Sequence, residues 1–223
     1  MIDPAKRFAP AALLLDMDGL MIDSEPLWFE VEREFVRARG GGDAWTDAMW
    51  RGCVGKGTPN TLAVMRDELG LAVDPAVDHE PLHDLFVARV SGLVFKAGLA
   101  ELLDAASGRA RLALASSSPA RLVGAVLDRF ELRSRFDAVV TGSDVARHKP
   151  APDVFVEAAR RLGVAAIDCL VLEDSLPGVT AARAAGMSVI AVPEGDLAGR
   201  DFDAVADAIV ADLHEARARI DWR

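Results

Sequence analysis

The sequence has few cysteines and no long apolar run. Cys53 and Cys169 are its two thiols, too few for a disulfide framework, and Cys169 lies within an apolar stretch. We expect both to be reduced and packed. No apolar run approaches the roughly 18 residues that indicate a membrane span, and the N-terminus carries no signal-peptide pattern. These absences predict a cytoplasmic protein without a membrane partner.

Positive charge is also scarce. The chain has 25 Lys and Arg against 35 Asp and Glu, which gives a formal net charge of −10 at pH 7. Surfaces that bind nucleic acid need clustered cations, so we expect no nucleic-acid partner. The length of 223 residues suits one domain with a large insertion, or two small domains, present as a monomer or weak homodimer.

Short apolar runs alternate with helical patterns over most of the chain. Helical patterns, with apolar residues spaced three to four apart, separate the later runs. This alternation predicts an α/β fold with buried parallel strands. The expected strands lie at 13–15, 112–115, 138–141, 170–172 and 189–192, and the helices between the later strands lie at 119–131, 151–163 and 175–186.

The stretch between the first and second expected strands shows only amphipathic helical segments. A crossover between two parallel strands normally needs one helix. We therefore expect the additional helices to form a separate all-helical cap over the strand ends. We place the cap at residues 25–94 and the core at residues 1–24 and 95–223. The helical segments lie near 25–39, 60–69, 81–92 and 98–107.

The first expected strand runs directly into Asp16-Met17-Asp18-Gly19. Ligands of open α/β sheets bind beyond the carboxyl ends of the strands, where these acids would stand. Asp16 and Asp18 can approach one cation, one through a side-chain oxygen and the other through a backbone carbonyl, if Gly19 permits the turn. An ordinary Asp-Gly turn is the alternative.

Two further strand ends carry groups suited to phosphate. Ser116 and Ser117 follow the second strand just before the helix that Pro119 opens, and hydroxyl and N–H groups at a helix N-terminus bind anions. Simple capping of that helix by a serine is the alternative. Lys149, held beside Pro150, can supply a fixed positive charge, unless it is merely solvated.

The fourth strand ends in two adjacent acids, Glu173 and Asp174. Adjacent carboxylates repel one another unless a cation or a proton lies between them. Capping of the following helix by either acid is the competing interpretation. Each of the four signals is weak alone, but a parallel sheet would bring all four strand ends together.

In this order the four groups resemble the four motifs of the haloacid dehalogenase superfamily of phosphotransferases. The longer strings Asp16-Met17-Asp18-Gly19-Leu20-Met21-Ile22-Asp23-Ser24-Glu25-Pro26 and Lys149-Pro150-Ala151-Pro152-Asp153 most resemble its sugar-phosphate phosphatase and β-phosphoglucomutase-like branch. This resemblance implies a Rossmann-like parallel sheet with helices on both faces and an inserted helical cap. In the fourth motif, many relatives carry a further aspartate where this chain has Gly178.

The resemblance also implies a chemistry. It implies a Mg²⁺-dependent phosphatase that acts on a small phosphorylated metabolite, a sugar phosphate, through an aspartyl-phosphate. Asp16 is then the nucleophile and Asp18 the general acid and base. The implied phosphate-binding residues are Ser116, Ser117 and Lys149, and the implied Mg²⁺ ligands are Asp16, the Asp18 carbonyl and Asp174, with support from Glu173.

Candidate readers of the leaving group lie in the expected cap. They are Trp28, Arg51 and Lys56, with a packed indole and solvated cations as the alternatives. In mutase relatives a histidine occupies the position of Trp28, so its absence here favours hydrolysis over a β-phosphoglucomutase-like transfer.

Two other functions remain open. His79-Glu80-Pro81-Leu82-His83 matches the zinc-peptidase pattern His-Glu-x-x-His. We expect the helix to start at Pro81, which would leave His79 outside and both histidines on the surface. A binding module without turnover is the other alternative, although such a protein need not keep like charges that destabilise its fold.

Overall fold

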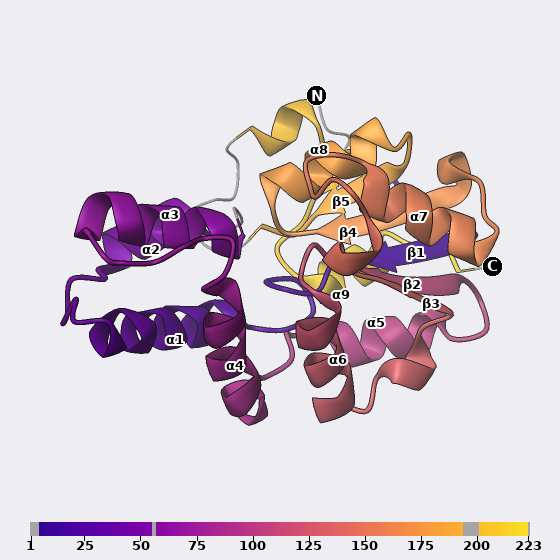
Figure 1. Cartoon of the computed structure of the whole chain (residues 1–223). Helices are drawn as coiled ribbons and strands as arrows, with labels where there is room; N and C mark the ends of the chain where they lie inside the picture. The colour runs from indigo at the N-terminus through magenta and orange to yellow at the C-terminus, as the bar shows by residue number, and fades with distance from the viewer. Residues whose placement is uncertain (1–4, 55–56, 194–200, 223) are drawn as a thin grey trace. The chain divides into compact units, whose positions relative to one another are not determined.

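The computed structural model describes residues 5–54, 57–193 and 201–222. Contacts divide the chain into two compact units. The core unit comprises Met1–Asp23 and Phe95–Arg223, and the helical unit comprises Ser24–Val94. Figure 1 labels their helices and strands. No helix in the described ranges is both long and apolar enough to cross a membrane.

A six-stranded parallel sheet forms the centre of the core unit, in the order β3-β2-β1-β4-β5-β6. Five strands lie where the apolar runs predict them, whereas β6 was not predicted, because two residues are too few to leave a recognisable run. The strands are β1 (Ala12–Leu15), β2 (Arg111–Ala115), β3 (Ala138–Val140), β4 (Cys169–Glu173), β5 (Ser188–Ala191) and β6 (Ala208–Ile209).

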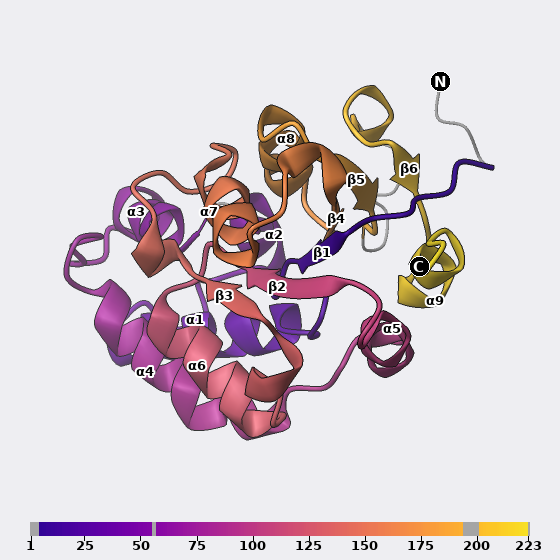
Figure 2. The same cartoon turned by 90° about the vertical axis from the view of Figure 1, so that its right-hand side faces the viewer.

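Helices cover both faces of this sheet (Figure 2). Helices α7 and α8 pack on one face, where alanines such as Ala113 and Ala115 let the α7 backbone approach closely. Helices α5, α6 and α9 lie on the other side. The predicted α/β, Rossmann-like fold class is confirmed. The helices are α5 (Leu99–Ala106), α6 (Ala120–Arg129), α7 (Asp153–Leu162), α8 (Leu176–Ala184) and α9 (Leu213–Ala218), with short 3₁₀ turns at Arg133–Arg135, Gly142–Asp144, Ala166–Asp168 and Phe202–Ala204.

The central strand β1 lies between β2 and β4, where the chain switches direction across the sheet. In the sheet register Leu15 pairs with Leu172 of β4 and Leu114 of β2. The Asp16 N–H then donates to the Leu172 carbonyl at 3.2 Å. Ligand sites of such folds lie at this switch point, beyond the strand ends. The register therefore sets the acids that follow β1 beside those that end β4.

The described residues of the helical unit form helices around their own apolar core. Val31, Phe35, Trp45 and Leu62 are among its buried residues. The helices are α1 (Glu25–Ala38), α2 (Asp47–Cys53), α3 (Thr58–Leu69) and α4 (His79–Arg89), followed by a 3₁₀ turn at Val90–Gly92. Helix α2 was not predicted, although Thr46 caps it by accepting a hydrogen bond from the Met49 N–H at 3.3 Å.

Helix α4 corrects the expected helix start. It begins at His79, so Pro81 lies in the first turn, where a missing N–H removes no intrahelical bond. His83 is buried, and its Nε2 lies 3.2 Å from the Thr58 hydroxyl. The expectation that the helix starts at Pro81 and that both histidines are surface residues was therefore wrong.

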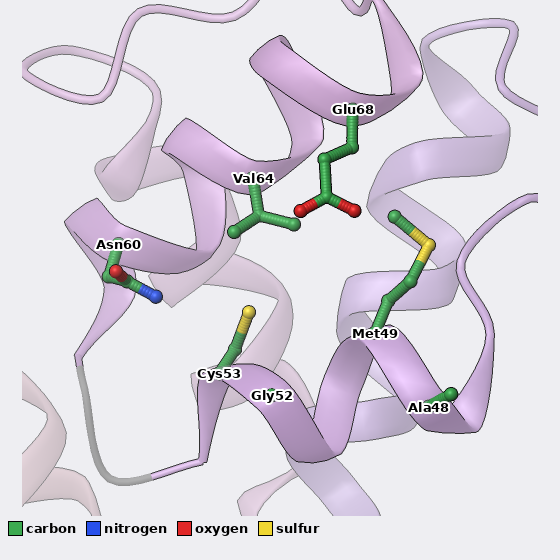
Figure 3. Close-up of a pocket in the computed structure, with 7 residues that line it drawn as sticks. All are labelled: Ala48, Met49, Gly52, Cys53, Asn60, Val64 and Glu68. Atoms are coloured by element: carbon green, nitrogen blue, oxygen red, sulfur yellow. The ribbon is translucent and has the colours of Figure 1, made fainter.

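A hollow of about 380 Å³ lies between α2 and α3 (Figure 3). Cys53 and Met49 of α2 border it, and Glu68 of α3 points toward it. Cys53 and Cys169 are both buried free thiols, as expected. The full lining is Ala48, Met49, Gly52, Cys53, Asn60, Val64 and Glu68, which includes none of the residues proposed above for phosphate chemistry.

One carboxyl group is enclosed in the helical unit. Glu32 of α1 is 5% exposed, and its Oε2 accepts a hydrogen bond of 3.1 Å from Trp45 Nε1. Burial raises the pKa of Glu32 from 4.5 to about 8, because the single indole bond only partly replaces the water lost by the ionised form.

We predict that Glu32 makes stability depend on pH. The folded protein favours the protonated acid, so the free energy of unfolding should fall as pH rises from about 4.5 to about 8, by about 1 kcal/mol per pH unit. Glu32→Gln should remove the contribution of Glu32 to this decline, so that the stability of the variant relative to the parent rises with pH and exceeds it at pH 8. Urea unfolding of both proteins between pH 5 and 8.5 measures the difference. Glu30→Gln, an exposed change on the same helix, is the control, and a pH-independent difference for Glu32→Gln would contradict the prediction.

Candidate active site

Residues that follow or end three strands of the core unit meet at one buried lysine. The Lys149 ammonium donates to Asp16 Oδ1 and, at 2.6 Å, to Glu173 Oε1. The side chains of Lys149, Asp16 and Glu173 are 7%, 9% and 1% exposed. Ligand oxygens of Asp16, Glu173 and Asp174 all lie within 4.8 Å of one another. The alternative of a solvated lysine is therefore wrong.

Packing on α7 holds Lys149 in this position. The lysine precedes α7, and its Nζ lies 4.9 Å from the ring centroid of Phe155, which is fully buried in that helix. An ammonium over an aromatic face is attracted by the ring quadrupole. The aromatic ring and the two carboxylates together fix a cation that would otherwise extend into solvent.

Burial and mutual repulsion shift the pKa values of this cluster. Burial raises the pKa of Asp16 to about 7, with Lys149 opposing and Glu173 adding to the rise. Burial and the charge of Glu173 raise the pKa of Asp174 well above its usual value. Burial alone would lower the pKa of Lys149, but attraction to Asp16 and Glu173 outweighs it and the pKa rises. The cluster thus contains more acidic groups than its single ammonium can balance, which is why ionisation of Asp16 and Asp174 is disfavoured.

The loop after β1 closes against Asp174. Gly19 has a φ of +78°, and a Cβ at this position would collide with the Asp174 carboxylate. A glycine meets both requirements, since it adopts positive φ freely and has no side chain. Gly19 therefore lets the Asp16–Asp18 loop approach the carboxylate that follows β4.

The loop after β2 supplies a serine that the sequence analysis did not single out. Ser118 Oγ donates to Asp18 Oδ2 at 2.7 Å, and the Ser118 N–H donates to Ser116 Oγ at 3.0 Å. Pro119 occupies the N-cap position of α6 without a side-chain cap, so the capping interpretation of the serines was wrong. The run of serines at a strand end is the signal that could have identified Ser118.

Glu173 is anchored on its other side by the start of α8. Its Oε2 accepts bonds from the Ser175 N–H at 2.7 Å and the Ser175 hydroxyl at 2.9 Å. Ser175 caps α8 by accepting from the Gly178 N–H at 3.1 Å, so neither acid is the cap. A Cβ at Gly178 would collide with the Glu173 carboxylate, which fills the space beside the helix.

The donor set fits a hard divalent cation. Asp18 Oδ1, Asp174 Oδ1 and Ser117 Oγ are buried, and none of them has a hydrogen-bond partner in the part of the chain that the structure describes. Unpartnered buried oxygens are costly, and carboxylate oxygens are the ligands that Mg²⁺ prefers. The residues present therefore suit Mg²⁺ together with an anionic ligand.

Three residues were expected to recognise the leaving group, and two of them are described within the helical unit. Trp28 of α1 stacks on Phe86 with ring centroids 4.4 Å apart. Arg51 is exposed on α2, where it pairs with Asp47 at 2.7 Å. Lys56 lies outside the described residues. Trp28 is therefore a packed indole, and Arg51 is part of a surface ion pair.

The described residues offer no support for a zinc peptidase. His79 and His83 share α4, with ring centroids 5.6 Å apart. A catalytic zinc site needs three protein ligands, and in the described ranges the one such group of His, Cys, Asp and Glu is Asp16, Glu173 and Asp174.

Known proteins resemble this chain over nearly its full length. The family model for haloacid dehalogenase-like hydrolases matches residues 10–186. Hexitol phosphatase B of Escherichia coli K12 is 32% identical over 93% of this chain and 95% of its own. Fructose-1-phosphate phosphatase YqaB of the same organism is 31% identical over 82% of this chain and 96% of its own. The crystal structure of CbbY from Rhodobacter sphaeroides in complex with phosphate superposes with a TM-score of 0.82 at 28% identity, covering 92% of this chain and 95% of that one. The chain therefore belongs to the haloacid dehalogenase-like hydrolase family and is a phosphatase.

Proposed function

We propose that the protein is a Mg²⁺-dependent phosphatase that hydrolyses a small sugar phosphate through an aspartyl-phosphate on Asp16. The observation that carries this proposal is the buried contact of Lys149 with Asp16 and Glu173, beside Asp174, at the carboxyl edge of the sheet. The similarity to a hexitol phosphatase and a fructose-1-phosphate phosphatase supports a sugar phosphate as substrate.

Asp16 acts as the nucleophile. Its Oδ1 is bound to Lys149, so Oδ2 is the oxygen that attacks phosphorus. The bond between phosphorus and the leaving oxygen breaks as the new bond forms, and Asp18 gives the leaving oxygen its proton. Asp18 then takes a proton from the water that attacks the aspartyl-phosphate, which releases phosphate and restores both acids.

Phosphate binding falls to Ser116, Ser117 and Lys149. Their hydroxyls and ammonium face the charge that spreads over the phosphoryl oxygens in the transition state. Ser117 Oγ is buried and has no partner within residues 5–54, 57–193 and 201–222, as expected of a donor reserved for a ligand.

Mg²⁺ would be held by Asp16, the Asp18 carbonyl and Asp174. Both carboxylate oxygens of Glu173 already accept hydrogen bonds, so its support consists of fixing Lys149 and the start of α8. When bound, the cation cancels repulsion between the carboxylates and the phosphate.

The helical unit is proposed to act as a cap that excludes water and reads the leaving group, with Trp28, Arg51 and Lys56 as contacts. An indole cannot exchange protons with a sugar hydroxyl as a histidine can. Trp28 therefore favours transfer of the phosphoryl group to water over transfer to a second sugar position.

Replacing the two aspartates tests the mechanism. Asp16→Asn should abolish phosphate release, because the amide is not a nucleophile. Asp18→Asn should reduce turnover about 10²–10⁴-fold, the usual loss for a general acid. Phosphate release from p-nitrophenyl phosphate and a panel of sugar phosphates measures both, with urea unfolding as a check on the fold. Asp104→Asn, an exposed acid of α5, is the control, and full activity of either active-site variant would refute the mechanism.

Metal removal tests the cofactor. Chelation should abolish phosphate release, because the clustered carboxylates would then repel the substrate, and added Mg²⁺ should restore it. Asp174→Asn should raise the Mg²⁺ concentration needed for half-maximal activity by about tenfold or more. Activity that survives exhaustive chelation, or an unchanged Mg²⁺ requirement in Asp174→Asn, is incompatible with the proposed metal site.

A further inference from the structure

The two carboxylate oxygens of Asp18 have different surroundings. Oδ2 accepts the hydrogen bond of 2.7 Å from the Ser118 hydroxyl. Oδ1 is buried and has no partner among the described residues. The two oxygens of a free carboxylate are equivalent, so the serine is what distinguishes them here.

Ser118 is itself held in place by its backbone. Its N–H donates to Ser116 Oγ at 3.0 Å, and its carbonyl accepts from the Gly142 N–H at 2.9 Å. The loop after β3 approaches so closely that a Cβ at Gly142 would collide with the Ser117 carbonyl. Two backbone bonds and this close contact leave the Ser118 side chain little freedom in where it points.

We propose that Ser118 is a positioning residue that orients the Asp18 carboxyl group for proton transfer. By binding Oδ2, it reserves Oδ1 as the oxygen that gives the proton to the leaving group and later takes one from water. This inference rests on the proposed function, in which Asp18 is the general acid and base.

The same serine links the acid to the phosphate-binding loop. Because the Ser118 N–H donates to Ser116 Oγ, the Ser116 hydroxyl hydrogen is left to donate elsewhere, toward the phosphoryl group. The segment 116–118 therefore fixes the position of a hydroxyl that binds phosphate relative to the position of the general acid. A misplacement of about 1 Å between reacting groups can reduce a rate by about 10²-fold, so the constraint bears directly on catalysis.

Substrates that differ only in leaving group test the inference. The ratio kcat/KM reports the steps up to departure of the leaving group. The weakly basic p-nitrophenolate departs without protonation, whereas the more basic phenolate depends more strongly on a proton from the general acid. Ser118→Ala should reduce kcat/KM for phenyl phosphate about 10–100-fold and that for p-nitrophenyl phosphate less than about threefold. Ser118→Thr, which keeps the hydroxyl, should recover phenyl phosphate hydrolysis to within about threefold of the parent.

Ser143→Ala is the matched control. Ser143 is an exposed serine whose hydroxyl accepts from the Ala120 N–H at the start of the same helix, α6, and its loss should leave both substrates unaffected. An equal loss on the two substrates in Ser118→Ala, or no loss on either, would overturn the positioning role.

Asp18→Asn separates this inference from the proposed function. If Asp18→Asn shows the leaving-group dependence and Ser118→Ala does not, the positioning role alone is wrong. If Asp18→Asn hydrolyses phenyl phosphate as well as the parent does, Asp18 is not the general acid, and the proposed mechanism falls together with this inference.

Discussion

A buried ammonium between two carboxylates is the interaction on which the core unit's site depends. Lys149 contacts both Asp16 and Glu173, and all three side chains are almost completely enclosed. Removing one member of such a group would leave an uncompensated buried charge, which is strongly destabilising. The parallel sheet makes the arrangement possible, because its register sets the residues after β1 beside those that end β4. The site has more carboxyl groups than Lys149 can balance, and this excess of potential ligands makes it suitable for a divalent cation.

The strand ends of this site could be predicted from the sequence, since buried parallel strands read as short apolar runs and the runs of β1, β2 and β4 stop at polar residues. Other elements left weaker signals. Strand β6 is two residues long, and α2 and α9 are short helices whose apolar periodicity is hard to distinguish from chance. The start of α4 was misjudged because proline is disfavoured inside helices but tolerated in the first turn.

Ser118 shows a different limit of sequence reasoning. A serine before a proline satisfies the local rule for a helix cap, and that rule was a sufficient explanation of the run Ser116-Ser117-Ser118. In the fold the hydroxyl instead meets Asp18, which lies 100 residues away in the chain. Local patterns identify which groups stand at a strand end, but the partner that each group selects depends on how neighbouring loops pack. Glu32 is a similar case, since an acid on an amphipathic helix reads as solvent-facing yet is enclosed beside Trp45.

Glu173 and Gly178 share one volume beside the first turn of α8, and this has an evolutionary consequence. The glutamate occupies the space that any side chain at 178 would need. An aspartate at position 178 would therefore require a shorter or reoriented side chain at position 173. A protein with both an aspartate at 178 and the present Glu173 conformation would be overpacked beside α8. Which side chain can be accommodated at either position is therefore constrained by the residue at the other.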